Sequence, residues 1–142
     1  MSLFNVFDVA GSAMNAQSMR LNVTASNLAN ADAVSTTAAG AYRARHPVFQ
    51  TAMVGANAAS AEEPAAAGVR VLDVVQSDTT PVRRHDPGNP LADAEGYVWG
   101  SNVNPVEEMA NMISASRSYQ TNVEIMDASK QMLTRTLALG QQ

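Results

Sequence analysis

The sequence predicts an α+β protein in which N- and C-terminal helices pair as a coiled-coil-like stalk and a small β-rich unit lies between them. Two observations support this class. Apolar residues recur at helical spacing near both ends of the chain, and the middle carries short strand-like runs separated by glycine, proline and asparagine. A length of 142 residues is typical of one domain, so separate substrate and cofactor domains are not expected.

The first segment, residues 1–31, is predicted to form a helix over residues 2–31. Its apolar stripe consists of four residues spaced one heptad apart: Phe7, Met14, Leu21 and Leu28. Gln17 and Ser18 interrupt this stripe. Because most helical stability comes from packing, we expect this helix to need a partner.

The middle segment, residues 32–104, is predicted to be the β-rich unit. Strand-like composition occurs at 42–54, 69–76 and 97–99. Residues 55–68 are almost entirely small or polar, which is typical of a mobile loop.

The last segment, residues 105–142, is predicted to be a long helix over residues 105–139. Asn104 is suited to the N-cap, Pro105 to the first helical position and Gly140 to the end of the helix. The apolar residues of its stripe are Met109, Met112, Tyr119, Val123, Met126, Leu133 and Leu137. The helix would be roughly 50 Å long at 1.5 Å per residue. Its partner is either the N-terminal helix of the same chain or helices of neighbouring copies, and periodicity favours neither.

The charge balance excludes several classes of function. A formal net charge of −4 with no basic segment argues against nucleic-acid binding. The absence of cysteine excludes disulfides and thiolate chemistry. Neither a signal peptide nor a membrane-spanning stretch is visible, so we expect no export by the general secretory route.

No motif for catalysis, cofactor binding or metal binding is found, and none of these is predicted. His46 and His85 match no metal-ligand spacing. Three acidic residues near a turn, Asp86, Asp93 and Glu95, could serve glycoside hydrolysis as a carboxylate pair. Turn stabilisation explains them better.

Several long blocks resemble flagellar rod proteins. Residues 1–14 read MSLFNVFDVAGSAM and residues 17–32 read QSMRLNVTASNLANAD. Residues 87–98 (PGNPLADAEGYV) and the block 104–126 follow in the same order. Together they resemble the flagellar rod and hook family of axial proteins, and within it the C type of the basal-body proximal rod. The family motif is identified at Asn27, Leu28, Ala29 and Asn30.

One departure from the wider family concerns the segment after this motif. Many axial proteins have a Thr-Pro-Gly-Tyr turn there, whereas residues 33–40 intervene before Tyr42 in this chain. A longer connection is expected of the proximal-rod C type and therefore favours that type.

The resemblance implies a structural function in the bacterial flagellum. Such proteins polymerise into the rod within the periplasm, after export through the flagellar type III apparatus without a cleaved signal. The implied partners are the chain itself, other rod proteins, membrane-ring/rod adaptor proteins and the export apparatus, with no nucleic acid and no small-molecule substrate. The expected assembly interface consists of the apolar stripes of the two predicted helices.

Alternatives remain open at this point. The chain could be another proximal-rod or axial protein of the same family. From different classes, it could be a soluble type III export chaperone or adaptor, or an enzyme acting on peptidoglycan through Asp86, Asp93 or Glu95. We further expect that both terminal helices are disordered or loosely helical in the monomer and become ordered on assembly.

Overall fold

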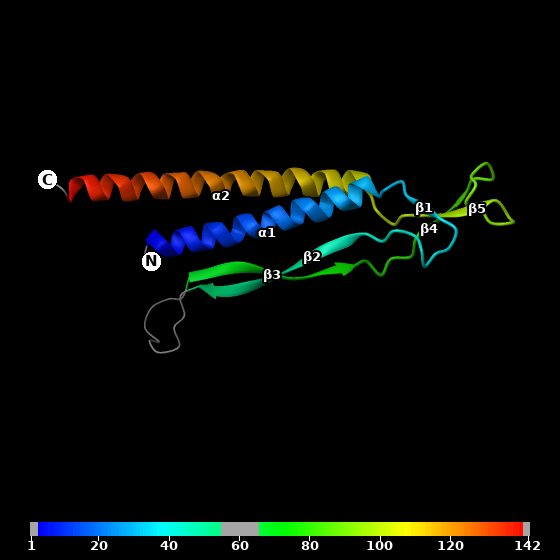
Figure 1. Cartoon of the computed structure of the whole chain (residues 1–142), viewed down its shortest axis with the longest axis horizontal. Helices are drawn as coiled ribbons and strands as arrows, with labels where there is room; N and C mark the ends of the chain where they lie inside the picture. Colours follow the sequence, from blue (N-terminus) through cyan, green and yellow to red (C-terminus); the bar gives the residue numbers. More distant parts are fainter. Residues whose placement is uncertain (1–2, 55–65, 141–142) are drawn as a thin grey trace. The chain divides into compact units, whose positions relative to one another are not determined.

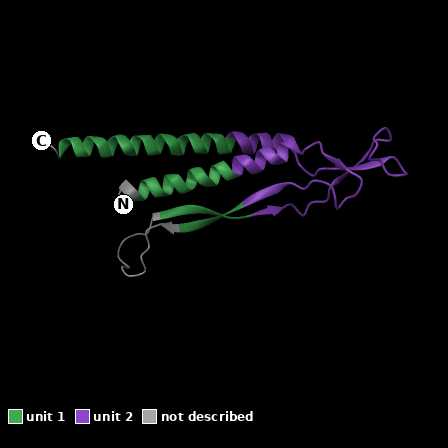
Figure 2. Cartoon of the chain, viewed as in Figure 1, with its two compact units in different colours: residues 1–19, 48–73, 114–142 green, residues 20–47, 74–113 purple. Residues whose placement is uncertain are grey.

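The computed structural model describes residues 3–54 and 66–140 of the chain. Residue contacts divide it into two compact units, shown in different colours in Figure 2. Unit 1 contains residues 1–19, 48–73 and 114–142, and unit 2 contains residues 20–47 and 74–113. Each unit contains parts of all three segments that the sequence analysis distinguished. That these three segments are separate domains stays a prediction.

Two helices and five strands make up the described chain (Figure 1). Helix α1 spans Leu3–Ala29 and helix α2 spans Pro105–Leu139, so the helices predicted at both ends are confirmed. Asn104 caps α2, because its Oδ1 accepts a hydrogen bond from the Val106 N–H at 3.1 Å. Neither of the described helices has the length and apolar character needed to cross a lipid bilayer.

The helices from the two ends of the chain pack together within each unit. In unit 1, residues of both helices line one small cavity of about 140 Å³, including Val6 and Val9 of α1 and Ile125 of α2. In unit 2, the Arg20 guanidinium donates to Asn111 Oδ1 at 2.9 Å. The predicted α+β class with paired terminal helices is therefore confirmed.

A three-stranded antiparallel sheet lies in unit 2. Its strands are β1 (Val34–Ser35), β4 (Val82–His85) and β5 (Tyr97–Gly100), in the order β1-β5-β4. Val98 at its centre is fully buried and pairs with Arg84. The sequence predicts β5 but neither neighbour, because β1 has two residues and every residue of β4 is exposed, which leaves no alternation to detect.

A second, two-stranded sheet pairs β2 (Arg45–Val54) with β3 (Ala66–Gln76). The first strand begins three residues later than predicted, because residues 42–44 make hydrogen bonds described below. The second begins three residues earlier, at Ala66. The predicted loop at 55–68 thus loses its last three residues to β3, and the rest of it lies outside the described residues. In unit 1 the Val69 N–H of β3 donates to Ser12 Oγ of α1 at 3.1 Å.

Candidate functional site

The family motif at the end of α1 holds the segment that leads into β2. Asn27 is buried, with 1% of its surface exposed. Its Nδ2 donates to the Arg45 carbonyl oxygen at 2.8 Å, and its Oδ1 accepts from the Arg45 N–H at 2.9 Å. The same Oδ1 accepts from the Tyr42 hydroxyl at 3.0 Å. One amide side chain therefore satisfies both backbone groups of Arg45 and fixes the Tyr42 ring.

The same segment is held from the other side by Asn102. The Ala44 N–H donates to Asn102 Oδ1 at 2.7 Å, and Asn102 Nδ2 donates to the Thr79 carbonyl oxygen at 2.7 Å. The Ser77 N–H donates to the Ala44 carbonyl oxygen at 2.8 Å. Residues 42–45 are thus fixed by bonds from the N-terminal, middle and C-terminal parts of unit 2.

The inward-facing positions of α2 carry small or polar side chains. The three buried residues of this helix, Glu108, Ala115 and Ser129, share one heptad register with the half-buried Asn122. Asn122 lines the cavity formed with α1 in unit 1, so this register faces α1 there. Ser129 satisfies its hydroxyl within the helix, by donating to the Ile125 carbonyl oxygen at 2.8 Å. Ile125 is a large apolar side chain of α2 that also lines this cavity, whereas Met132, Leu137 and Leu139 are exposed.

The predicted stripe residues divide into two groups. Half-buried are Phe7, Met14, Leu21, Leu28, Met112, Met126 and Leu133. Exposed are Met109, Tyr119, Val123 and Leu137, the last with 68% of its surface accessible. The stripe predicted for α2 lies beside the inward register rather than on it, and its role in assembly stays a prediction.

Five large apolar residues of α2 that sequence reasoning missed are also exposed: Val106, Ile113, Ile125, Met132 and Leu139. Ile125, Met132 and Leu139 are spaced one heptad apart, so they form a second stripe. This spacing was readable in the sequence, but the methionine-rich stripe on another side of the helix satisfies the same period. The exposed apolar surface of α2 is thus wider than the sequence predicts.

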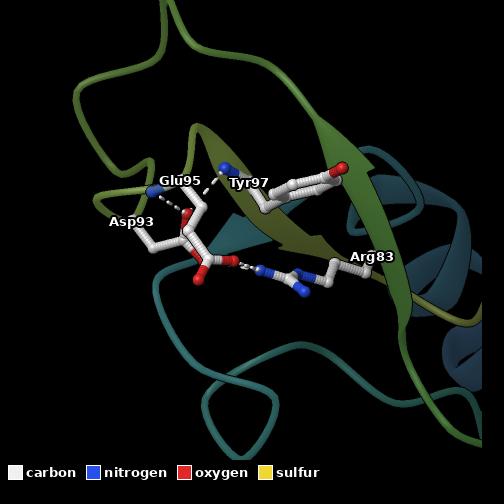
Figure 3. A network of polar contacts seen from close by, with 4 residues as sticks. All are labelled: Arg83, Asp93, Glu95 and Tyr97. Carbon is white, nitrogen blue, oxygen red and sulfur yellow. Dashed lines mark hydrogen bonds and ion pairs between the residues drawn. The ribbon is translucent and has the colours of Figure 1, made fainter.

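The three acidic residues near the turn are engaged in ion pairs on the β4–β5 hairpin. Arg83 Nη2 donates to Asp93 Oδ2 at 3.0 Å and to Glu95 Oε2 at 2.8 Å, while its guanidinium lies 4.1 Å from the centre of the Tyr97 ring (Figure 3). Arg84 lies 3.8 Å from the Asp86 carboxylate. These contacts tie the strands to the loop between them.

The electrostatics of this cluster oppose acid catalysis. The hydrogen bond from the Tyr97 N–H lowers the pKa of Asp93, the Arg83 guanidinium and the Glu95 N–H add to the effect, and partial desolvation works against it. The hydrogen bonds to Glu95 and then Asp93 raise the pKa of Arg83. A glycosidase acid needs a carboxyl whose pKa is raised so that it holds a proton at neutral pH. Asp93 instead stays ionised. Within the described residues, no group of three or more His, Cys, Asp or Glu side chains is placed to hold a metal ion.

Comparison with known proteins shows which class of protein has these helices and this motif. The family model "Flagella basal body rod protein" matches residues 7–35, and "Flagellar basal body rod FlgEFG protein C-terminal" matches residues 94–139. The first match covers most of α1 and the Asn27 motif, and the second covers β5 and α2. Both helices thus belong to segments typical of flagellar rod proteins.

Curated relatives specify the class further. The flagellar basal-body rod protein FlgC of Escherichia coli O6:H1 is 53% identical over 141 residues, which cover 99% of this chain and all of the relative. Those of Salmonella typhimurium and of Buchnera aphidicola from Schizaphis graminum are 51% and 42% identical, with the same coverage. The chain therefore belongs to the FlgC family of flagellar basal-body rod proteins.

Proposed function

We propose that this chain is a structural subunit of the bacterial flagellar basal body that polymerises into the proximal rod through its terminal helices. The observation that carries the proposal is the exposed apolar surface of α2 in a member of a rod-protein family. Leu137 and Leu139 near the end of α2 are 68% and 76% exposed. A monomer gains nothing from these exposed side chains, whereas a neighbouring subunit would bury them.

The energetics favour assembly through this surface. Each apolar side chain that is moved from water into a packed interface contributes about 25 cal/mol per Å² of buried area. Exposed apolar residues recur along α2 from Val106 to Leu139, so many small contributions add up over one helix. Ile125, Met132 and Leu139 share one side of α2, and an exposed apolar stripe of this kind is typical of a protein–protein interface.

The proposed partners follow from this role. They are further copies of the chain, other rod proteins, the adaptor between the membrane ring and the rod, and the flagellar export apparatus. The proposed location is the basal body where it crosses the periplasm, reached through the flagellar export route without cleavage of a signal. We propose no catalytic activity, since Arg83 already forms ion pairs with Asp93 and Glu95, two of the carboxylates that a glycosidase would need.

The test is a Met132→Asp/Leu137→Asp variant, which replaces two exposed apolar side chains of α2 with charges. We expect it to be made and exported normally, but to be lost from purified basal bodies and to leave the cells non-motile. A Gln131→Asp/Thr134→Asp variant is the matched control, because both positions are exposed and polar on the same helix. Normal rods containing the Met132/Leu137 variant would contradict the proposal.

A further inference from the structure

Two arginines line a pocket in unit 2 that the proposed role does not explain. The pocket has a volume of about 410 Å³ and is lined by Gly40, Tyr42, Arg43, Arg45 and Gln76, among others. In the part of the chain that the structure describes, neither guanidinium forms an ion pair with a carboxylate. Two like charges that share a pocket without a counter-charge repel each other, and a carboxylate would relieve this repulsion.

The pocket is held in place before any partner binds. Tyr42, which lines it, is fixed through its hydroxyl by Asn27 at 3.0 Å and by Ser26 at 3.2 Å. The Arg45 backbone is bound at both its N–H and its carbonyl, and the Arg45 guanidinium lies 5.7 Å from the centre of the Tyr42 ring. A fixed backbone lowers the entropy cost of binding, and the planar guanidinium suits carboxylate recognition.

The described helices offer one pair of exposed carboxylates that could meet both arginines together. Among the described residues, Asp86, Asp93 and Glu95 are already in ion pairs with arginines. Glu124 and Asp127 on α2 are both exposed and make no ion pair in the described structure. No other exposed pair of carboxylates lies within one turn of a described helix.

The spacing of the two carboxylates on α2 matches the spacing of the two arginines in the pocket. Residues three apart on a helix have Cβ atoms about 5–6 Å apart on one face. Residues two apart in an extended segment are separated by about 6–7 Å. Glu124 and Asp127 can therefore approach Arg43 and Arg45 together.

We propose that the Tyr42–Arg45 pocket binds the Glu124–Asp127 pair on α2 of a second copy of this chain. The inference rests on the proposed function, since it needs copies that lie next to each other, and it adds a polar contact of defined register to the apolar one. Apolar stripes that repeat every heptad allow neighbouring helices to slip by one repeat. A matched pair of charges fixes one register, because any other leaves guanidinium and carboxylate groups unpaired.

Charge reversal tests this contact in the living cell. The variants are Arg43→Glu/Arg45→Glu, Glu124→Arg/Asp127→Arg and the combination of all four changes. Each double variant should be recovered in purified basal bodies at least about tenfold less than wild type, because paired charges become repulsive, and the fourfold variant should recover most of the loss. The control is Arg70→Glu/Arg117→Glu, which makes the same change in net charge at exposed arginines that lie outside the pocket and form no ion pair in the described structure.

A cross-link gives a second readout that does not depend on reversed charges being tolerated. The chain contains no cysteine, so a single engineered pair reports one contact. Arg45→Cys combined with Asp127→Cys should give a disulfide-linked dimer in isolated basal bodies. Arg84→Cys with Asp127→Cys should give none.

Three outcomes would overturn this inference. One is incorporation of the double variants at the wild-type level. Another is a loss that the fourfold variant does not restore, together with no dimer. The third is a cross-link to a different protein, which would mean that the occupant is not a second copy. In all three cases wild-type protein would still be found in the rod, whereas its absence from purified rods would overturn the proposed function itself.

Discussion

Asn27 shows what a single motif residue contributes to the fold. Its amide satisfies the N–H and the carbonyl of Arg45, a residue 18 positions away, and accepts from the Tyr42 hydroxyl. Asn30, three residues on in the same motif, follows directly after α1 and donates to the Ser26 carbonyl in the last turn of that helix, at 2.8 Å. The two asparagines therefore have different tasks, since the first joins separate parts of unit 2 and the second ends a helix.

We predict that Asn27→Ala destabilises the protein by about 2 kcal/mol, because buried backbone groups lose their partner and gain no water. The measurement is the free energy of unfolding in urea. Asn30→Ala is the control and should cost clearly less, since only one bond at a helix end is lost. Equal losses for the two variants would show that the Asn27 bonds contribute nothing beyond a local turn.

At the scale of the element, the β4–β5 hairpin combines the buried Val98 of β5 with exposed ion pairs on β4. Every residue of β4 is exposed, and Arg83 joins the strand to Asp93 and Glu95 in the loop (Figure 3). The loop closes at Gly96, which has a φ of 79°. A side chain at this position would place its Cβ 3.1 Å from the Pro87 Cβ and 3.3 Å from His85 Nε2, so glycine is needed for both space and backbone conformation.

We predict that Asp93→Asn weakens this hairpin at pH 7 but not in acid. The pKa of Asp93 is lowered in the folded chain, so the carboxylate stabilises the hairpin above its ordinary pKa of 3.8. That contribution is lost as the pH falls from 3.8 toward the lower pKa of the folded state. Trp99, the single tryptophan and part of β5, reports the transition by its fluorescence during thermal unfolding.

Wild type and one control variant show whether the pH dependence of stability comes from Asp93. Asp78→Asn removes an exposed carboxylate of unit 2 that makes no ion pair in the described structure, and should leave the pH dependence unchanged. A stability difference between wild type and Asp93→Asn that is the same at pH 7 and at pH 3 would contradict the assignment.

At the scale of the whole molecule, the buried positions of the two helices are mostly small or polar. Ala10 and Ala16 of α1 and Ala115 and Ser129 of α2 are buried, while larger apolar side chains of α2 stay exposed. Burying an alanine contributes little free energy, because little apolar area is removed from water. The helices thus have a modest stabilising contact within the chain and a larger apolar surface available outside it.

From this balance we predict weak protection of both helices in the dilute monomer. Residue-resolved amide exchange should be fast over residues 3–29 and 110–139 and slow around Val98 in the three-stranded sheet. Assembly would then order the helices where neighbouring subunits bury their exposed faces. Strong protection along both helices would contradict this coupling and favour a self-contained hairpin, as an export chaperone would need.

Both helices, the strands β2, β3 and β5 and the family were predictable from the sequence, because heptad spacing, a cap at Asn104, strand-like composition and long motif blocks are local patterns. The tertiary structure settled which face of α2 is inward, since two apolar stripes on different sides of this helix satisfy the same helical period. It also decided what Asn27 binds and that Arg43 and Arg45 share a pocket. The Ala44 N–H, for example, donates a hydrogen bond to Asn102 Oδ1, 58 positions further along the sequence. Contacts of this kind depend on how distant segments pack, and no local pattern of residues encodes them.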